Sequence, residues 1–206
     1  MVTVHYFYDP MCGWCYGATP LIESIANSDQ FKLKLHPGGM LSAKTIESPF
    51  RQHILESDRQ IKQLTGAQFG DNYVKRVASS EELVMDSYLP TRAILIANSL
   101  KKSPFVMLKA IQKAHYLDGK SVNQMTTLNA IATQINLDPE LWKIEMAAID
   151  RIEERAIENS HKLMNQLGVR GYPTLILENK GRFLKLSHTE YYGRQQEWQA
   201  YLERLV

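Results

Sequence analysis

The chain has 206 residues, of which 44% are hydrophobic, and its 24 Lys and Arg residues against 22 Asp and Glu residues give a formal net charge of +2. This length and composition predict one domain, or one domain with a large insertion, whose core needs no disulfide bonds for stability. The nearly balanced charge excludes partners selected by bulk charge, so we expect no nucleic acid.

The N-terminal residues MVTVHYFYDP lack the basic and apolar regions of a signal peptide. No later stretch approaches the roughly 18 uninterrupted apolar residues that a membrane span needs. We therefore expect a soluble protein of the cytoplasm without a membrane partner, although a secreted protein stripped of its signal would have a similar sequence.

The first elements are a strand and a helix. β-branched or aromatic residues fill Val2 to Tyr8, which predicts a short buried strand that ends at Asp9-Pro10. From Cys12 the apolar spacing becomes helical, with an end near Asn27 to Asp29, and Pro20 should kink this helix.

The two cysteines of the chain lie at this strand-to-helix turn, in the stretch YDPMCGWCYGATP. A disulfide that closes a two-residue gap would constrain the unfolded chain very little. A structural zinc site needs four ligands, but there is no second C-x-x-C pair and the six histidines are scattered, so we expect no metal. Redox chemistry is the remaining interpretation.

The helix start predicts different roles for the two thiols. Free backbone N–H groups and the positive end of the helix dipole favour a thiolate at Cys12, which is therefore the candidate nucleophile. Cys15, one turn further along, can attack a mixed disulfide on Cys12 and is the candidate resolving thiol.

The alternation in Phe31 to His36 predicts a half-exposed edge strand. About five helices are expected between Leu41 and Ile149. Their starts are marked by Ser48-Pro49, Ser103-Pro104 and Asp138-Pro139, in which a capping residue precedes a proline at the first helical position, and Pro90 marks a further break.

The C-terminal part returns to mixed structure. Asp150 to Gly168 predicts a solvated amphipathic helix, Thr174 to Leu177 and Phe183 to Leu186 a hairpin, and residues 193–206 a last amphipathic helix. The predicted order is strand, helix, strand, helical block, helix, strand, strand, helix. A split α/β sandwich with a helical insertion accounts for this order.

The C-x-x-C pair at the first helix, the GVRGYPT element before the hairpin and this order resemble the thioredoxin superfamily. The helical block resembles its DsbA branch, and YDPMCGWCYG followed by PGGML is most similar to the FrnE-like group of dithiol oxidoreductases. The resemblance implies an α/β thioredoxin-like fold with a large all-helical insertion. Residues 1–40 and 150–206 would form the thioredoxin-like domain, and residues 41–149 the inserted domain.

The resemblance also implies the site residues. Tyr172-Pro173 would be a cis peptide lying against the cysteines, with an ordinary trans turn proline as the alternative. Substrate would bind at Gly13, Trp14, Tyr172 and Pro173, while Trp14 could equally be surface without a role. Many members carry a buried acid on the first strand where this chain has Tyr6, so proton relay from the resolving thiol lacks its usual assistant.

The predicted function is a dithiol-disulfide oxidoreductase or isomerase without a cofactor, acting on a disulfide- or thiol-containing protein or small molecule, with glutathione among the candidates. Two alternatives stay open. One is a glutathione-dependent isomerase or transferase of the kappa or 2-hydroxychromene-2-carboxylate type, whose members usually have a serine in place of Cys12. The other is a non-catalytic peptide-binding module.

Overall fold

A computed structural model describes residues 2–205. Met1 and Val206, which the predicted segments 1–40 and 193–206 include, lie outside the described residues. Within 2–205, no helix is long and apolar enough to cross a membrane.

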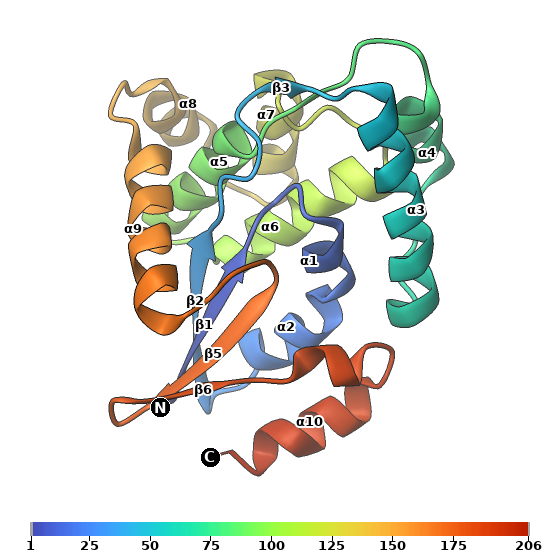
Figure 1. Ribbon diagram of the computed structural model, residues 1–206. Coiled ribbons are helices and arrows are strands. Elements are labelled where there is room, and N and C mark those ends of the chain that lie inside the picture. The colour runs from blue at the N-terminus through green and yellow to red at the C-terminus, as the bar shows by residue number, and fades with distance from the viewer. Residues whose placement is uncertain (1, 206) are drawn as a thin grey trace.

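A four-stranded mixed sheet forms the centre of the molecule, in the order β2-β1-β5-β6 (Figure 1). Its strands are β1 (Val2–Tyr8), β2 (Phe31–Pro37), β5 (Thr174–Asn179) and β6 (Arg182–Lys185). β2 runs parallel to β1, and β5 and β6 continue the sheet antiparallel. The buried first strand, the edge position of Phe31–Pro37 and the C-terminal hairpin are therefore confirmed.

Helices cover both faces of this sheet. On one face, Phe7 and Ile176 pack against Met164 of α9 (Ile152–Leu167). On the other, Tyr6 and Leu175 belong to the main core with α2 (Thr19–Ala26) and α10 (Gln195–Glu203). This alternation along β1 follows from the period of two of a strand that is covered on both sides.

The predicted first helix is divided in two. α1 (Gly13–Gly17) is followed by Ala18, which caps both helices, and Pro20 lies in the first turn of α2, which begins at Thr19. A proline fits there because the first amide groups of a helix have no intrahelical partner. The expected kink is therefore a break just before Pro20.

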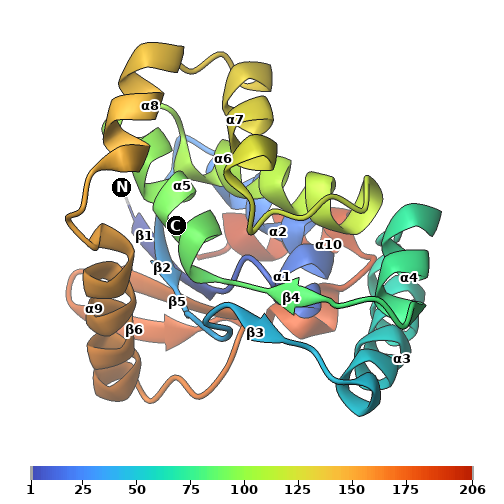
Figure 2. The ribbon, with the colours of Figure 1, turned by 90° about the horizontal axis from the view of Figure 1, so that it is seen from above.

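Six α-helices, not five, lie between residues 41 and 149. They are α3 (Ser48–Thr65), α4 (Asp71–Ala78), α5 (Tyr88–Ser99), α6 (Pro104–Gln112), α7 (Met125–Gln134) and α8 (Pro139–Ala147), and a π-helix (Lys113–Leu117) follows α6 directly. Two-residue strands, β3 (Lys44–Thr45) and β4 (Val84–Met85), pair antiparallel between them. Figure 2 shows this pair crossing between α3 and α4 on one side and α8 and α9 on the other.

Two of the predicted helix starts differ from the structure. The α3 cap is Glu47, and Ser48 is already helical. Pro90 lies inside α5 rather than before it, again in the first turn, where no amide hydrogen bond is lost. Asp138 caps α8 as predicted, because its side chain accepts a hydrogen bond from the Leu141 amide at 2.8 Å. The division into a thioredoxin-like domain of residues 1–40 and 150–206 and an inserted domain of residues 41–149 stays a prediction. The arrangement of the elements does not show which segments fold as separate units.

Candidate functional site

Cys12 begins α1 and acts as its N-cap. Its backbone is extended, with φ −88° and ψ 113°, and its Sγ accepts a hydrogen bond from the Cys15 amide at 3.3 Å. This is the geometry in which a Ser or Asp side chain normally caps a helix. The sulfur therefore lies where the helix end favours negative charge.

The two cysteines are free thiols with different environments. Cys12 is 7% exposed and Cys15 is fully buried. Burial raises the pKa of the Cys15 thiol, and so do the hydrogen bond and the charge of Cys12, while the Asp9 backbone amide opposes part of this effect. Cys15 is therefore held as a neutral thiol.

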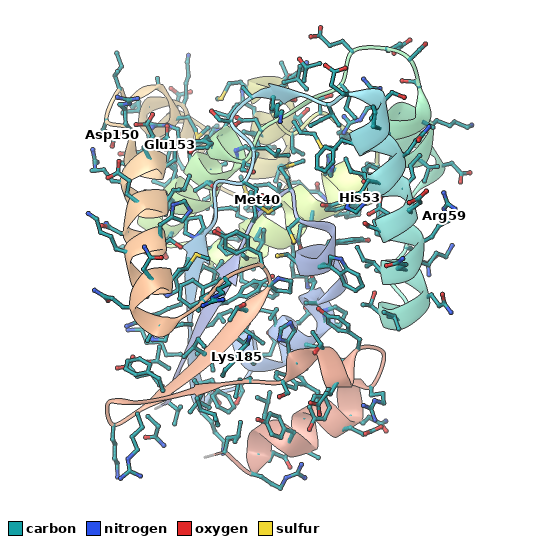
Figure 3. The ribbon with its side chains drawn as sticks, viewed as in Figure 1. Met40, His53, Arg59, Asp150, Glu153 and Lys185 are labelled. Atoms are coloured by element: carbon teal, nitrogen blue, oxygen red, sulfur yellow. The ribbon has the colours of Figure 1, made fainter. Side chains whose placement is uncertain are left out.

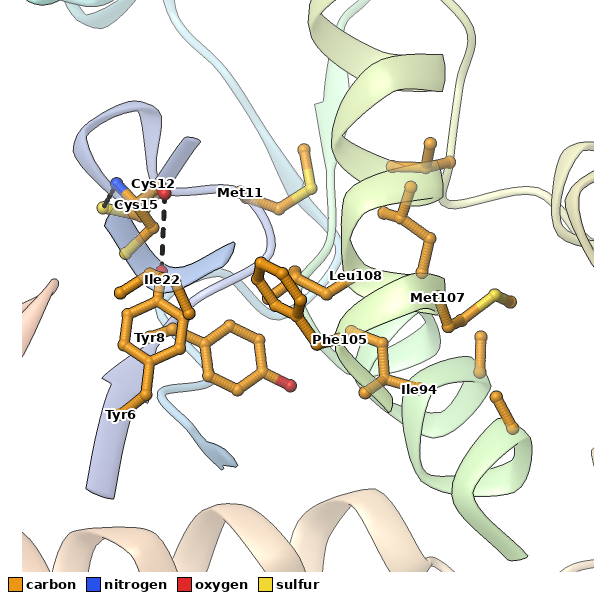
Figure 4. Close-up of a cluster of buried hydrophobic side chains, with 14 of the residues drawn as sticks. Tyr6, Tyr8, Met11, Cys12, Cys15, Ile22, Ile94, Phe105, Met107 and Leu108 are labelled. Atoms are coloured by element: carbon orange, nitrogen blue, oxygen red, sulfur yellow. Dashed lines mark hydrogen bonds between the residues drawn. The ribbon is translucent and has the colours of Figure 1, made fainter. Parts of the chain in front are cut away.

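Tyr6 on β1, where the resemblance led us to look for an acid, lies against the second cysteine. Its hydroxyl donates to the Cys15 carbonyl at 3.4 Å, as Figure 4 shows together with the contact between Cys15 and Cys12. Burial raises the pKa of Tyr6 well above its usual value. The hydroxyl therefore stays protonated.

Asp9 holds the loop before Cys12 in place, a role that its interpretation as a strand stop missed. Its buried carboxylate accepts hydrogen bonds from the Met11 amide, the Met40 amide and the Ser87 hydroxyl, each at 2.8 Å. The bond to Met11, two residues on, is an Asx turn, which Asp-Pro before the cysteines could have signalled. Asp9 thus ties the active-site loop to the connection after β2 and to the start of α5.

A groove lies beside Cys12 on the sheet side. The bond between Tyr172 and Pro173 is cis, as the resemblance implies, and the Cys12 thiol donates to the Tyr172 carbonyl at 3.8 Å. Trp14 stacks on Tyr192 with ring centroids 6.0 Å apart. Trp14, Tyr172, Pro173 and Tyr192 line a pocket of about 350 Å³, so three of the predicted site residues come together there. Cys12 lies next to them through its contact with Tyr172, and Cys15 is buried behind Cys12.

Gly13, the sixth predicted site residue, packs against α3. A Cβ built on Gly13 would lie 3.0 Å from Ile61 Cδ1 and 3.1 Å from Asp58 Oδ1. Such contacts are tighter than ordinary packing, so the absence of a side chain allows α3 to approach the start of α1.

A second cavity, of about 220 Å³, lies on the α3 side of Cys12. Its polar lining includes Ser57, Asp58, Tyr73, His53 and His115. Met40 and His53 approach it from the connection after β2 and from α3 (Figure 3). The sequence did not indicate this cavity, because its residues come from separate helices and share no motif.

Residues 2–205 contain no group of three or more His, Cys, Asp or Glu side chains that could hold a metal ion. The site is thus a pair of thiols at a helix start, flanked by the groove at Pro173 and by a partly open cavity that Asp58 lines. This arrangement defines a thioredoxin-fold protein equipped for thiol chemistry.

Comparisons with known proteins agree with this class. The family model described as the DSBA-like thioredoxin domain matches residues 3–190. The chain therefore belongs to the DSBA-like thioredoxin family, and it is a thiol-disulfide oxidoreductase. A search among curated proteins found no match.

Solved structures extend the likeness over the whole chain. The cytosolic disulfide reductase DsbM from Pseudomonas aeruginosa is 35% identical, with a TM-score of 0.91 over 99% of this chain and 100% of that one. Its structure with GSH is 33% identical, with a TM-score of 0.89 over 98% of both chains. A 2-hydroxychromene-2-carboxylate isomerase, 12% identical with a TM-score of 0.58 over 98% of this chain and 97% of that one, shares the fold alone.

Proposed function

We propose that this protein reduces disulfides with glutathione as the thiol donor, and that Cys12 and Cys15 form the pair that exchanges with the substrate. One observation carries the division of roles: Cys12 caps the start of α1 and keeps 7% of its surface exposed, whereas Cys15 behind it is fully buried. The likeness to a cytosolic disulfide reductase that has been solved with GSH supports the direction of the reaction, the thiol donor and a cytosolic location.

The reaction proceeds through two exchanges. The Cys12 thiolate attacks one sulfur of the substrate, the substrate S–S bond breaks, and the released thiolate takes a proton from solvent. Cys15 then gives up its proton and attacks the Cys12 sulfur, which releases the second substrate thiol and leaves a Cys12–Cys15 disulfide. Two glutathione molecules reduce this disulfide and leave as glutathione disulfide.

The groove beside Cys12 is the proposed place for the substrate chain. Tyr172 offers its backbone next to the thiol, in the manner of an added strand, and Trp14 with Pro173 offers apolar surface. Gly13 contributes by keeping the start of α1 free of a side chain. The raised pKa of Cys15 prevents that thiol from competing with Cys12 for substrate.

Single Cys→Ser variants test this assignment. Cys15→Ser should accumulate mixed disulfides, because the intramolecular attack that resolves them is lost, and Cys12→Ser should not, because the remaining thiol is shielded. The measurement is intact mass after acid quench, alongside glutathione-dependent turnover of a small disulfide. Adducts in equal yield on both variants would show that the nucleophile is misassigned.

The same preparations separate the alternatives. Glutathione conjugation that survives in both variants would support a transferase or isomerase instead. Absence of both disulfide turnover and conjugation in the wild type would support a peptide-binding module.

A further inference from the structure

The cavity on the α3 side of Cys12 contains a carboxylate that the proposed exchange reaction does not use. Asp58 is 6% exposed, and its Oδ2 accepts a hydrogen bond from the Tyr73 hydroxyl at 2.8 Å. Among the described residues, that hydroxyl is its one hydrogen-bond partner, and no Lys, Arg or His nitrogen pairs with it. A buried carboxylate without a cation is costly, because buried charges are normally paired.

No other residue of the lining supplies the missing cation. The lining residues within 2–205 include no Lys or Arg. His115 presents a neutral ring, because its Nδ1 accepts from the Arg76 guanidinium at 3.0 Å and burial lowers its pKa to about 3. Arg76 itself is turned toward His115 and the Ser121 hydroxyl. His53 lies at the exposed rim, stacked on Phe50.

The walls of the cavity suit a small cation. Four aromatic residues, Trp14, Phe50, Tyr73 and Tyr116, line it together with methionine and aliphatic side chains. Aromatic faces attract ammonium groups, most strongly where water is excluded. The volume of about 220 Å³ exceeds the roughly 150 Å³ that is enough for one benzene molecule, so a short organic ammonium group fits.

The carboxylate also lies next to the reacting thiol. Cys12 and Asp58 line the same cavity, and Asp58 Oδ1 approaches the residue after Cys12, Gly13, so closely that a Cβ there would be 3.1 Å away. A small substrate bonded through its sulfur to Cys12 therefore lies at the cavity that holds the carboxylate. An ammonium group on a short chain from that sulfur is the partner that this arrangement favours.

We propose that this cavity binds the ammonium group of small aminothiol disulfides, with Asp58 as the counter-ion, so that the class represented by cystamine is a preferred substrate. The inference rests on the proposed disulfide reduction. The Cys12 thiolate attacks one cystamine sulfur, the S–S bond breaks, and one cysteamine leaves and is protonated by solvent while the other stays bonded to Cys12. Resolution as above releases the second cysteamine, and two glutathione molecules supply the two electrons.

Two substrates and one variant isolate the contribution of the charge. Cystamine and bis(2-hydroxyethyl) disulfide differ only in an ammonium group against a hydroxyl at each end. Asp58→Asn removes the charge but keeps an oxygen for the Tyr73 hydroxyl. The measured quantity is kcat/KM for each disulfide with glutathione, and the ratio between the two substrates cancels general effects on Cys12.

Asp58→Asn should lower this ratio by about tenfold or more, as expected for loss of one desolvated charge partner. Glu56→Gln is the matched control, because it removes the same charge from the same helix at an exposed position. That variant should leave the ratio unchanged. Equal changes for both disulfides in Asp58→Asn, or an equal effect of Glu56→Gln, would overturn the proposal.

Binding of an unreactive analogue keeps the inference separate from the proposed function. The thioether 2-(methylthio)ethylamine should perturb the NMR signals of residues around Asp58 in the wild type, and should do so much less in Asp58→Asn, whereas 2-(methylthio)ethanol should not distinguish the two proteins. Analogue binding without turnover of either disulfide would uphold the site and refute the proposed function. Turnover of both disulfides, with no effect of Asp58→Asn on the substrate ratio or on analogue binding, would uphold the proposed function and refute the site.

Discussion

Asp58→Asn should stabilise the fold at neutral pH, although it removes a group from the active-site region. Burial raises the pKa of the Asp58 carboxyl from 3.8 to about 6, and the hydrogen bond from Tyr73 offsets only part of that effect. An asparagine has the same shape, carries no charge and can still accept from Tyr73. The variant therefore avoids the cost of burying an ionised carboxylate.

The sign and size of the effect follow from linkage. The folded-state pKa is higher than the unfolded value, so the favourable contribution of the protonated form is complete below about pH 4 and is lost as the pH rises through 6. The difference between 3.8 and about 6 corresponds, at about 1.4 kcal/mol per pH unit, to about 3 kcal/mol. As the pH rises from 4 to 7.5, the free energy of unfolding of Asp58→Asn should therefore increase relative to that of the wild type by up to this amount.

Urea unfolding of the reduced proteins, followed by far-ultraviolet circular dichroism across this pH range, measures the difference. Glu56→Gln, at an exposed position on the same helix, should show a difference from wild type that hardly changes with pH. A free energy difference between Asp58→Asn and wild type that stays constant, or that shrinks as the pH rises, would refute the reasoning. It would mean that the carboxylate is solvated or paired in the folded protein.

Two further changes test the scaffold of the site. Asp9→Ala leaves the Met11 and Met40 amides and the Ser87 hydroxyl without their acceptor. We therefore expect the free energy of unfolding to fall by about 3 kcal/mol or more, whereas Asp29→Ala, at an exposed site, should leave it unchanged. Gly38→Ala places a Cβ 2.5 Å from the Tyr172 ring, so it should displace that ring and lower kcat/KM for disulfides; unchanged kinetics would show that the ring position does not matter for substrate.

The sequence was sufficient for the parts of the fold that have a strong period or a strong local signal. The strand at Val2–Tyr8 and the edge strand at Phe31–Pro37 follow from alternation and β-branched content, and Asp138 caps α8 through its own side chain. Strands of two residues, such as β3 and β4, are too short to show the alternation of buried and exposed residues that predicts a strand. Pro90 was misjudged as a break because proline is compatible with the first turn of a helix as well as with the segment before it.

The site was predictable only where its residues are joined in sequence or by resemblance. Cys12 and Cys15 are three residues apart, and Tyr172 next to Pro173 was expected from the family likeness. Asp58 and Tyr73 lie on α3 and α4, and their hydrogen bond joins two helices that no local pattern relates. A lone acid on an amphipathic helix is usually solvated, so its burial could be found only from the packing of α3 against α1.

The two sides of Cys12 differ in charge, and under both proposals this difference sorts the halves of an unsymmetrical disulfide. The groove at Tyr172, Pro173 and Trp14 offers aromatic surface and a backbone carbonyl, and no Asp, Glu, Lys or Arg lines it. Its one histidine, His188, favours the neutral form because burial lowers its pKa. The cavity at Asp58 presents a carboxylate. Glutathione has a net negative charge at neutral pH and carries its ammonium group many bonds from its sulfur, so under both proposals we expect it in the groove, whereas we expect the short aminothiol in the cavity. A mixed disulfide of the two therefore has one favoured orientation across Cys12, and the charge of a single residue on α3 determines it.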